Sequence, residues 1–275
     1  MTEVNEAPPG VDPTTPSPAR LYDYYLGGVD NYPVDREAAQ RLYKVVPELP
    51  DAAWANRGFH QRATRWMAAK SDIRQFIDIG AGLPTQNNTH LAARKEIPNA
   101  RVLYVDNDPL VQAHAKALLT GAASTRFITA DLRDPDGVLS HPDTSALIDF
   151  DAPVGLLMTA VLHFVADESD PWGLVTRYLD ALAPGSYLAL THITADSKPP
   201  AAVQAFRDLY ASATERIYLR TKAEVERFLA GLDIVPPYEG AGGVVTWMGE
   251  WGAEDPRAAD SDGSRWGYGA VGRLR

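Results

Sequence analysis

Residues 76–82 read FIDIGAG, a short apolar run that leads into two glycines separated by one alanine. Apolar and β-branched residues in such a run favour a buried β-strand. Glycines after a strand allow a tight turn whose backbone N–H groups can approach a ligand closely. Thr85, three residues later, belongs to the types that cap a helix, and the N-terminus of a helix favours an anion. The stretch therefore predicts a strand, a turn and a helix, with a ligand near Gly80, Ala81 and Gly82.

Similar apolar runs alternate with helical segments along the rest of the chain. The helical segments have recognisable limits, such as Asp108 and Pro109 at the start of one helix and the capping sequence of residues 221–224 before another. The runs that favour strands lie at residues 76–80, 101–106, 126–131, 154–160, 186–191, 233–235 and 268–274. Strands that alternate with helices are typical of a doubly wound α/β fold with a mostly parallel sheet.

The first 70 residues lack this alternation. Five of the 21 prolines fall within residues 1–18, so this segment is predicted to be a disordered leader. A tyrosine-rich stretch follows at residues 20–35, and a helix with one apolar face is expected over residues 51–70. We therefore expect a helical arm at residues 19–70, which extends a single sheet domain at residues 71–275.

The composition limits both the partners and the chemistry of the protein. Of 275 residues, 26 are Lys or Arg and 36 are Asp or Glu, which gives a net charge of −10. This charge repels nucleic acids and anionic membranes, so neither is expected as a partner. The chain has no cysteine, which excludes disulfides and thiolate metal sites, and no metal is predicted. Because the sequence shows neither a signal peptide nor an apolar run of about 20 residues, we expect a cytoplasmic protein.

Acidic residues lie near the ends of the first three predicted strands. Asp106 ends the second strand, 26 residues after Gly80, where its carboxylate can accept two hydrogen bonds from a ribose diol. Asp78 lies near the end of the first strand, and Asp131 ends the third. Since ligands of open α/β sheets bind along this carboxyl edge, the three acids and the glycine turn predict one binding site.

The order of these motifs resembles the class I S-adenosylmethionine-dependent methyltransferases, and more narrowly an actinobacterial group of S-adenosyl methyltransferases with no assigned substrate. The resemblance runs through residues 19–28, 78–85, 104–109, 130–135, 160–164 and 269–273, and so covers nearly the whole chain. It implies a seven-stranded, Rossmann-like sheet with one antiparallel strand near the C-terminus. It also implies S-adenosyl-L-methionine as the cofactor.

The resemblance assigns roles to individual residues. Asp78 and the backbone of residues 80–82 should meet the methionyl part of the cofactor, Asp106 the ribose, and Asp131 and Leu132 the adenine. Arg57 is the candidate for binding the cofactor carboxylate, and the alternative is a charge on a solvated helix face. The full set of candidate cofactor contacts is Asp78, Gly80, Ala81, Gly82, Thr85, Asp106, Asn107, Asp131, Leu132, Thr159, Ala160, Arg57, Tyr25, Asn31 and Tyr32.

Two further hypotheses concern the acceptor and the arm. His163 follows the strand at residues 154–160, where class I enzymes line the methyl-transfer site, and an imidazole there could orient or deprotonate an acceptor. The alternative is a packed histidine bonded to a backbone group. Tyr25, Asn31 and Tyr32 lie around two glycines and are candidates for a lid over the cofactor, the alternative being ordinary packing of the arm.

The leading interpretation is a methyltransferase that acts on an unidentified small molecule. One alternative is a protein that binds S-adenosylmethionine without turning it over, because no acid/base pair in the sequence is compelling. Another is a nicotinamide-dependent oxidoreductase, but its GxGxxG motif needs a third glycine where this chain has Thr85. The methyl acceptor, the atom methylated, the use of a general base and the oligomeric state stay open.

Overall fold

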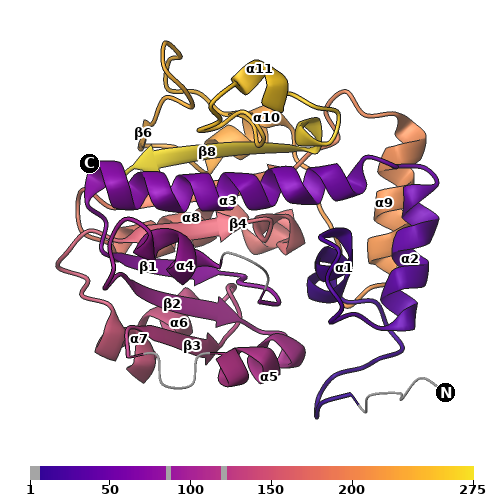
Figure 1. Ribbon diagram of the computed structural model, residues 1–275, viewed down its shortest axis with the longest axis horizontal. Helices are drawn as coiled ribbons and strands as arrows, with labels where there is room; N and C mark the ends of the chain where they lie inside the picture. The colour runs from indigo at the N-terminus through magenta and orange to yellow at the C-terminus, as the bar shows by residue number, and fades with distance from the viewer. Residues whose placement is uncertain (1–6, 85–87, 119–122) are drawn as a thin grey trace.

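The centre of the molecule is a mixed β-sheet whose strands run in the order β3-β2-β1-β4-β5-β8-β6, with β7 paired to β8 (Figure 1). The structure, a computed structural model, describes residues 7–84, 88–118 and 123–275. The strands are β1 (Gln75–Ile79), β2 (Arg101–Asp106), β3 (Thr125–Thr129), β4 (Gly155–Thr159), β5 (Tyr187–Ile193), β6 (Asp233–Ile234), β7 (Thr246–Trp247) and β8 (Gly267–Arg273). Strands β1 to β5 are parallel, and β8 is antiparallel to β5, β6 and β7.

Helices cover both faces of this sheet. Alternate residues of β1 illustrate the two layers, because Phe76 packs in the cluster that contains α3 and Ile77 packs in the cluster on the opposite face. The α-helices are α1 (Pro18–Tyr25), α2 (Pro33–Tyr43), α3 (Leu49–Ser71), α4 (Thr89–Arg94), α5 (Pro109–Leu118), α6 (Pro135–Leu139), α7 (Pro142–Leu147), α8 (Pro171–Asp180), α9 (Pro200–Ala211), α10 (Lys222–Arg227) and α11 (Pro256–Ala259). In the described part of the chain, no helix combines the length and apolar character needed to cross a membrane.

The predicted fold class is confirmed. The seven predicted strands lie within two residues of those observed, the long helix expected at residues 51–70 is α3, and β8 is the strand that opposes β5. The structure adds β7, a two-residue strand on β8. The third strand ends at Thr129 rather than at Asp131, so that acid lies beyond the strand.

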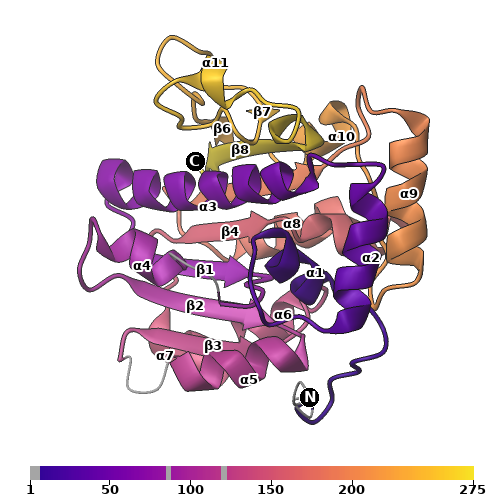
Figure 2. The same cartoon turned by 45° about the vertical axis from the view of Figure 1, so that its right-hand side comes forward.

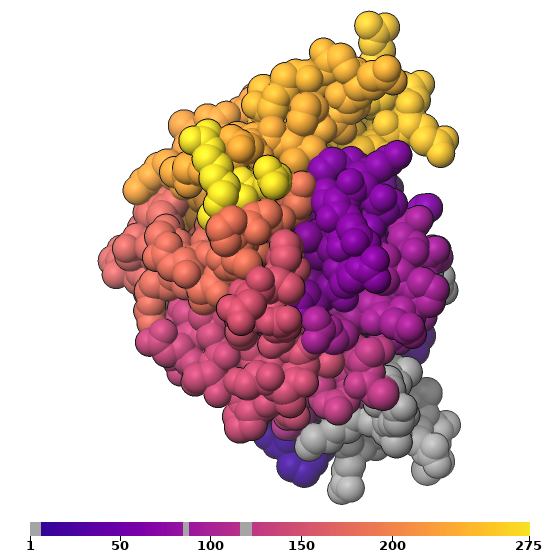
Figure 3. Space-filling model, turned by 90° about the vertical axis from the view of Figure 1, so that its left-hand side faces the viewer, coloured from indigo at the N-terminus to yellow at the C-terminus, as the bar shows by residue number. Residues whose placement is uncertain are grey.

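Three helices stand beyond the carboxyl ends of the parallel strands (Figure 2). These are α1, α2 and α9. At the other end of the molecule, α3 lies beside the C-terminal third of the chain (Figure 3), and Arg62 donates hydrogen bonds to backbone carbonyls there, including that of Trp251 at 2.7 Å. The long helix thus ties the N-terminal arm to the far edge of the sheet.

The described part of the predicted leader, residues 7–17, packs on the body of the protein. Ser17 is buried, and its hydroxyl donates to Asp108 Oδ2 at 2.8 Å. The backbone N–H of Thr214 donates to the carbonyl of Pro16 at 2.9 Å. These contacts satisfy polar groups of a proline-rich segment that a sequence pattern alone marks as unstructured.

Candidate active site

A cavity of about 420 Å³ lies at the carboxyl ends of β1, β2, β4 and β5. This size is ordinary for a site that binds a small molecule. One part of its wall, the polar side, consists of Arg57, Asp78, Gly80, Ala81, Gly82, Asp106, Asn107, Asp108, Leu132 and Arg133. Another part, the aromatic side, consists of His163, Phe164, Phe206, Tyr210, Met248 and Trp266. The two sides belong to different regions of the fold, because the polar side follows mainly β1 to β3 and the aromatic side lies beside β4, β5, β8 and α9.

The turn after β1 forms the floor of the polar side. Gly80 and Gly82 have φ values of +71° and +65°, the left-handed region that favours glycine. The N–H groups of Gly80 and Ala81 both donate to the carbonyl of Val105 in β2. A Cβ atom at position 80 would overlap the side chain of Val161. The turn is therefore required by packing beneath it as well as by access to the cavity.

Asp106 holds the turn from the end of β2. Its Oδ2 accepts the N–H of Gly82 at 2.8 Å, and its Oδ1 accepts the N–H of Asp108 at 2.9 Å. Burial raises the pKa of Asp106 to about 6, against these backbone hydrogen bonds, which lower it. Each carboxylate oxygen can accept a further hydrogen bond, so the group is suited to a ligand with two adjacent hydroxyls.

A second carboxylate of the polar side connects to a buried histidine. Thr89 donates its hydroxyl proton to Asp78, and His60 Nε2 lies 2.7 Å from the same hydroxyl oxygen. Nε2 of His60 is thus the donor, and Nδ1 accepts from the hydroxyl of Thr159 at 2.9 Å. Burial, with a smaller effect of Arg57, lowers the pKa of His60 to about 3, while burial raises that of Asp78 to about 6. This neutral imidazole therefore fixes the end of β4 relative to β1.

Arg57 is buried at the cavity rather than placed on a solvated helix face. Its Nη2 donates to Asn88 Oδ1 at 3.0 Å, and its charge lowers the pKa of Asp78 against the larger effect of burial. A guanidinium beside a carboxylate gives the polar side groups of both signs, which suits a ligand with an ammonium and a carboxylate.

Asn56, one residue earlier on α3, joins four elements around the cavity. Its Nδ2 donates to the hydroxyl of Tyr22 in α1 at 2.7 Å, and its Oδ1 accepts the hydroxyl of Thr191 in β5. Thr191 in turn accepts the N–H of Ala160 at 2.8 Å. Ala160 has a φ of +54°, a strained conformation for a residue with a Cβ, and this network supports it at the cavity wall.

Asp131, the predicted adenine contact, is not among the described residues that line the cavity. Arg133 binds its carboxylate through Nε at 2.8 Å and Nη2 at 2.7 Å, and Asn107 donates to it at 3.3 Å. Arg133 also contacts Glu215 at 3.1 Å. The nearby arginine thus engages the acid that the sequence pattern assigned to the ligand, while Leu132 between them does line the cavity.

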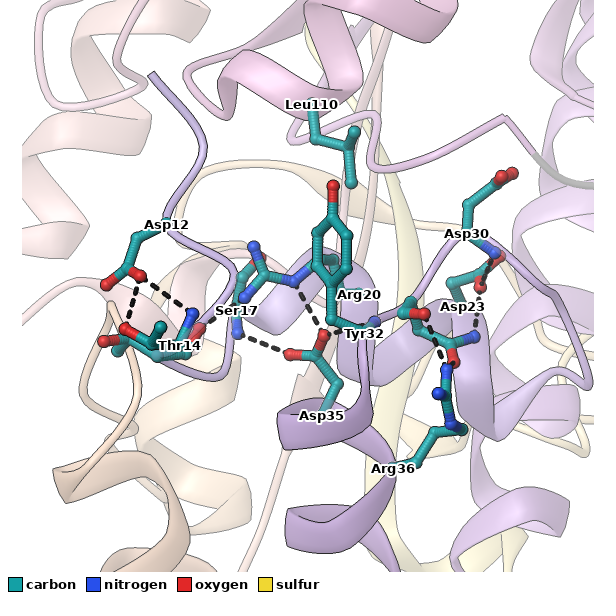
Figure 4. Close-up of polar contacts among 12 residues, drawn as sticks. Asp12, Thr14, Ser17, Arg20, Asp23, Asp30, Tyr32, Asp35, Arg36 and Leu110 are labelled. Atoms are coloured by element: carbon teal, nitrogen blue, oxygen red, sulfur yellow. Dashed lines mark hydrogen bonds and ion pairs between the residues drawn. The ribbon is translucent and has the colours of Figure 1, made fainter. Parts of the chain in front are cut away.

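The arm is held by a network around Asp35, shown in Figure 4. Arg20 Nε lies 2.8 Å from Asp35 Oδ2, and both side chains are buried. The same carboxylate accepts the N–H of Ser17 at 3.1 Å and that of Tyr32 at 2.9 Å. This network fixes the segment before α1, including Gly10, over the polar side of the cavity.

Only one of the three predicted lid residues lies at the cavity. Tyr25 lines it, whereas Asn31 and Tyr32 are not among its described lining residues. Asn31 donates to Asp23 at 2.8 Å, and the ring of Tyr32 packs beside Leu110, as Figure 4 shows. Asn31 and Tyr32 therefore support the arm from behind, and the covering residues come from the segment before α1.

The histidine proposed for the acceptor lies on the aromatic side, beside a second histidine. His192 Nδ1 donates to the carbonyl of Ile193 at 2.7 Å, and its Nε2 accepts from Arg220 at 2.8 Å. For His163, by contrast, Nδ1 is buried without a hydrogen-bond partner among the residues described. Burial, followed by the charges of His192 and Arg220, holds the pKa of His163 well below its usual value. Both imidazoles are thus neutral near pH 7, since burial also lowers the pKa of His192 to about 3.

Most of the predicted site residues are brought together at the cavity, but two polar residues of α3 were not predicted. The predicted residues that line the cavity are Asp78, Gly80, Ala81, Gly82, Asp106, Asn107, Leu132, Thr159, Ala160, Arg57, Tyr25 and His163. Thr85 lies outside the described residues. Asn56 and His60 were not predicted, although Asn56, His60 and Thr64 form a polar stripe at four-residue spacing on the buried face of α3. Such a stripe on an otherwise apolar helix face was the available signal.

Comparisons with known proteins agree with this geometry. Residues 4–275 match the S-adenosyl methyltransferase family. A structure from Thermobifida fusca YX, provisionally named a methyltransferase, is 38% identical, with a TM-score of 0.90 over 98% of this chain and 99% of that one. A DUF574 family protein of Streptomyces avermitilis MA-4680 is also 38% identical, with a TM-score of 0.87 over 95% and 98% of the two chains.

A curated relative is similar over a shorter region. The trans-aconitate 2-methyltransferase of Mycobacterium tuberculosis H37Ra is 32% identical over 175 residues, which cover 62% of this chain and 57% of the relative. The chain therefore spans a little over half the length of that relative. Because the family match extends over nearly the whole sequence, the predicted resemblance and the predicted cofactor are confirmed, and the chain belongs to the S-adenosyl methyltransferase family.

Proposed function

We propose that the protein transfers a methyl group from S-adenosylmethionine to a small molecule inside this cavity, with the cofactor on the polar side and the acceptor on the aromatic side. One observation carries the proposal: the carboxylate of Asp106 and the glycine turn of residues 80–82 meet at the adjoining ends of β1 and β2, within the cavity. This is the edge at which open α/β sheets bind their ligands.

The polar side offers groups that match the parts of the cofactor. The carboxylate of Asp106 can accept hydrogen bonds from the ribose hydroxyls, and Leu132 offers an apolar surface to the adenine. Arg57 can bind the methionyl carboxylate, and Asp78 can face the ammonium group. Asp131, Asn31 and Tyr32 are left out of this proposed set because they are not among the described residues that line the cavity.

The protein contributes position and a dry environment. When bound, the cofactor supplies a methyl group on a positively charged sulfur. As the acceptor atom bonds to the methyl carbon, the bond between sulfur and that carbon breaks, and the sulfur becomes a neutral thioether. The strand ends bind and orient the cofactor, and the aromatic side excludes water from the acceptor. His163, with an unpartnered Nδ1 among the described residues, is the candidate for orienting the acceptor.

We also propose that the protein works in the cytoplasm, on a small molecule rather than on nucleic acid. The net charge of −10 supports the choice of a small molecule, because nucleic acid is a polyanion and would have to approach a protein of the same sign. We further propose that the chain divides into an arm at residues 19–70 and a sheet domain at residues 71–275.

Calorimetry of the purified protein tests the proposal. S-adenosylmethionine and S-adenosylhomocysteine should bind, and NAD should not. Incubation with S-adenosylmethionine and a metabolite extract should then yield a compound heavier by one methylene unit, as measured by mass spectrometry. Binding of the cofactor with no methylated product from any extract would favour the non-catalytic alternative, and binding of NAD alone would contradict the proposal.

A further inference from the structure

The aromatic side of the cavity presents flat apolar surfaces. Phe206 and Tyr210 lie one turn apart on α9 with their rings nearly parallel, at an angle of 3° and a centroid distance of 6.3 Å. The ring of Phe206 lies 4.8 Å from that of Trp266, and the ring of Phe164 lies 5.8 Å from that of Tyr210. Met248, whose side chain adapts to irregular shapes, lines the same region. Such walls favour a flat ring system, because aromatic faces and edges interact best with other rings.

The aromatic side offers no charge to an acceptor. None of its six residues is acidic or basic apart from His163, whose pKa burial holds well below its usual value. Two buried cations of the region are already engaged. Arg20, which lines the cavity, pairs with Asp35. Arg220 contacts Asp167, His192 and the carbonyls of Leu162 and Val165. A carboxylate or phosphate placed here would lose its hydration without gaining a partner of opposite charge.

One polar atom on this side awaits a partner. His163 is 6% exposed, and in the described residues its Nδ1 has no hydrogen-bond partner. The neighbouring His192 differs, since both of its ring nitrogens are satisfied. A buried polar atom without a partner costs free energy unless a ligand supplies the missing hydrogen bond. A neutral imidazole nitrogen can accept a hydrogen bond from a hydroxyl group.

We propose that the aromatic side binds an uncharged, flat, apolar acceptor that carries a hydroxyl group, and that this hydroxyl donates its hydrogen bond to the imidazole of His163. This inference rests on the methyltransferase function proposed above and specifies its substrate class. It distinguishes this protein from an enzyme for a polycarboxylate, such as the substrate named for the mycobacterial relative. A polycarboxylate binds best where several cationic groups meet, and the six residues of the aromatic side include no Lys or Arg. The arginines that line the cavity, Arg20, Arg57 and Arg133, lie outside this set.

Three probes of the same ring system test the proposal by calorimetry on protein saturated with S-adenosylhomocysteine. These probes are 2-naphthol, its methyl ether 2-methoxynaphthalene, and the anion 2-naphthoate; trans-aconitate serves as a polycarboxylate. The naphthol should bind about tenfold more tightly than the ether, which cannot donate a hydrogen bond. The naphthol should also bind at least about tenfold more tightly than 2-naphthoate, because the charge of 2-naphthoate must be desolvated. Trans-aconitate should not bind.

A variant separates the role of the histidine from general packing. In His163→Leu, the naphthol should lose its advantage and bind no better than the ether, while the affinity for the ether changes little. The matched control is His141→Leu, which removes a half-exposed imidazole at the start of α7, away from the cavity. It should retain the wild-type ratio between the naphthol and the ether. Thermal denaturation and the affinity for S-adenosylhomocysteine report whether each variant is folded.

The outcomes distinguish this inference from the proposed function. Failure of S-adenosylhomocysteine to bind the wild type would overturn both. If S-adenosylhomocysteine binds normally, three results would overturn the acceptor proposal alone. These are no binding of the naphthol, binding of the anions as tight as that of the naphthol, and binding of the ether as tight as that of the naphthol. An unchanged ratio of naphthol to ether affinity in a folded His163→Leu variant would likewise overturn the assigned hydrogen bond.

Discussion

The two sides of the cavity are built in different ways. The polar side uses strand ends and a glycine turn, so its groups are held by the hydrogen bonds of the sheet, as Gly82 and Asp106 illustrate. The aromatic side combines α9 with segments near β7 and β8, and its residues are held by ring contacts such as that between Phe206 and Trp266. A site based on the sheet fixes atoms closely, whereas a site based on side-chain packing can change shape with each substitution. Under the proposed assignment of the two sides, recognition of the cofactor and recognition of the acceptor have separate structural origins.

The largest effect on stability is expected from Gly80→Val, a substitution in the glycine turn at the floor of the polar side. A branched side chain would adopt a positive φ and overlap Val161, so a loss of about 3–5 kcal/mol in the free energy of unfolding is expected. Thermal and urea denaturation measure it. The matched control is Gly82→Ala, where a Cβ meets no described atom within 4 Å and only the backbone strain of about 1–2 kcal/mol remains. Equal losses in the two variants would show that overlap with Val161 is unimportant.

Asp106→Ala should weaken binding of S-adenosylmethionine by about 1–3 kcal/mol, because charge-assisted hydrogen bonds to the ligand and to Gly82 disappear. Calorimetry measures the change, and circular dichroism checks the fold. Asp131→Ala provides the comparison, since its carboxylate binds Arg133 rather than lining the cavity. We expect the second variant to lose less affinity than the first. The reverse order would restore Asp131 as the cofactor contact and remove Asp106.

The affinity of the polar side should depend on pH. Burial raises the pKa of both Asp78 and Asp106 from 3.8 to about 6, so between these values the folded protein keeps protons that the unfolded chain releases. Their contribution to stability is therefore largest at low pH and declines as pH rises through this window. Hydrogen bonds from the cofactor need the ionised carboxylate, so affinity should follow the opposite trend and fall below pH 6, by up to about tenfold per pH unit for each carboxylate.

Calorimetry with S-adenosylhomocysteine between pH 5 and pH 8 measures this trend. Asp106→Asn should bind more weakly at pH 8 and show a shallower decline on acidification, with the remainder due to Asp78. An affinity that is constant down to pH 5 in the wild type would mean that neither carboxylate accepts a hydrogen bond from the ligand.

The smallest effect concerns which elements each ligand protects. S-adenosylhomocysteine should slow hydrogen exchange most strongly in residues 10–20, which cover the polar side, and more weakly in α9, which contacts the arm through α2. Addition of 2-naphthol should then slow exchange in α9, whose Phe206 and Tyr210 line the aromatic side. Mass spectrometry of peptides gives both results. Protection of α9 by S-adenosylhomocysteine alone, with residues 10–20 unaffected, would reverse the assignment of the two sides.

The two sides also differ in how far the sequence predicts them. The strands, the turn at residues 80–82 and Asp106 follow from local patterns, because apolar runs, glycines and acids at strand ends keep their meaning in most α/β folds. Phe206 and Trp266 could not be paired from the sequence, since they are 60 positions apart and meet only when α9 packs against the segment before β8. The carboxylate of Asp131 could not be placed from the sequence for a local reason, because Arg133 two residues later binds it.

The buried pair of Arg20 and Asp35 has a consequence for the order of events. It joins α1 to α2, and α2 packs against α9, so the arm and the wall of the aromatic side are mechanically connected. A movement that opens residues 10–20 for the cofactor thus also withdraws support from the helix that carries Phe206 and Tyr210. In the binding order that we propose, the acceptor pocket is complete only after the arm has closed over the cofactor. We therefore expect a compulsory sequence of binding, in which the cofactor enters first and its demethylated product departs last.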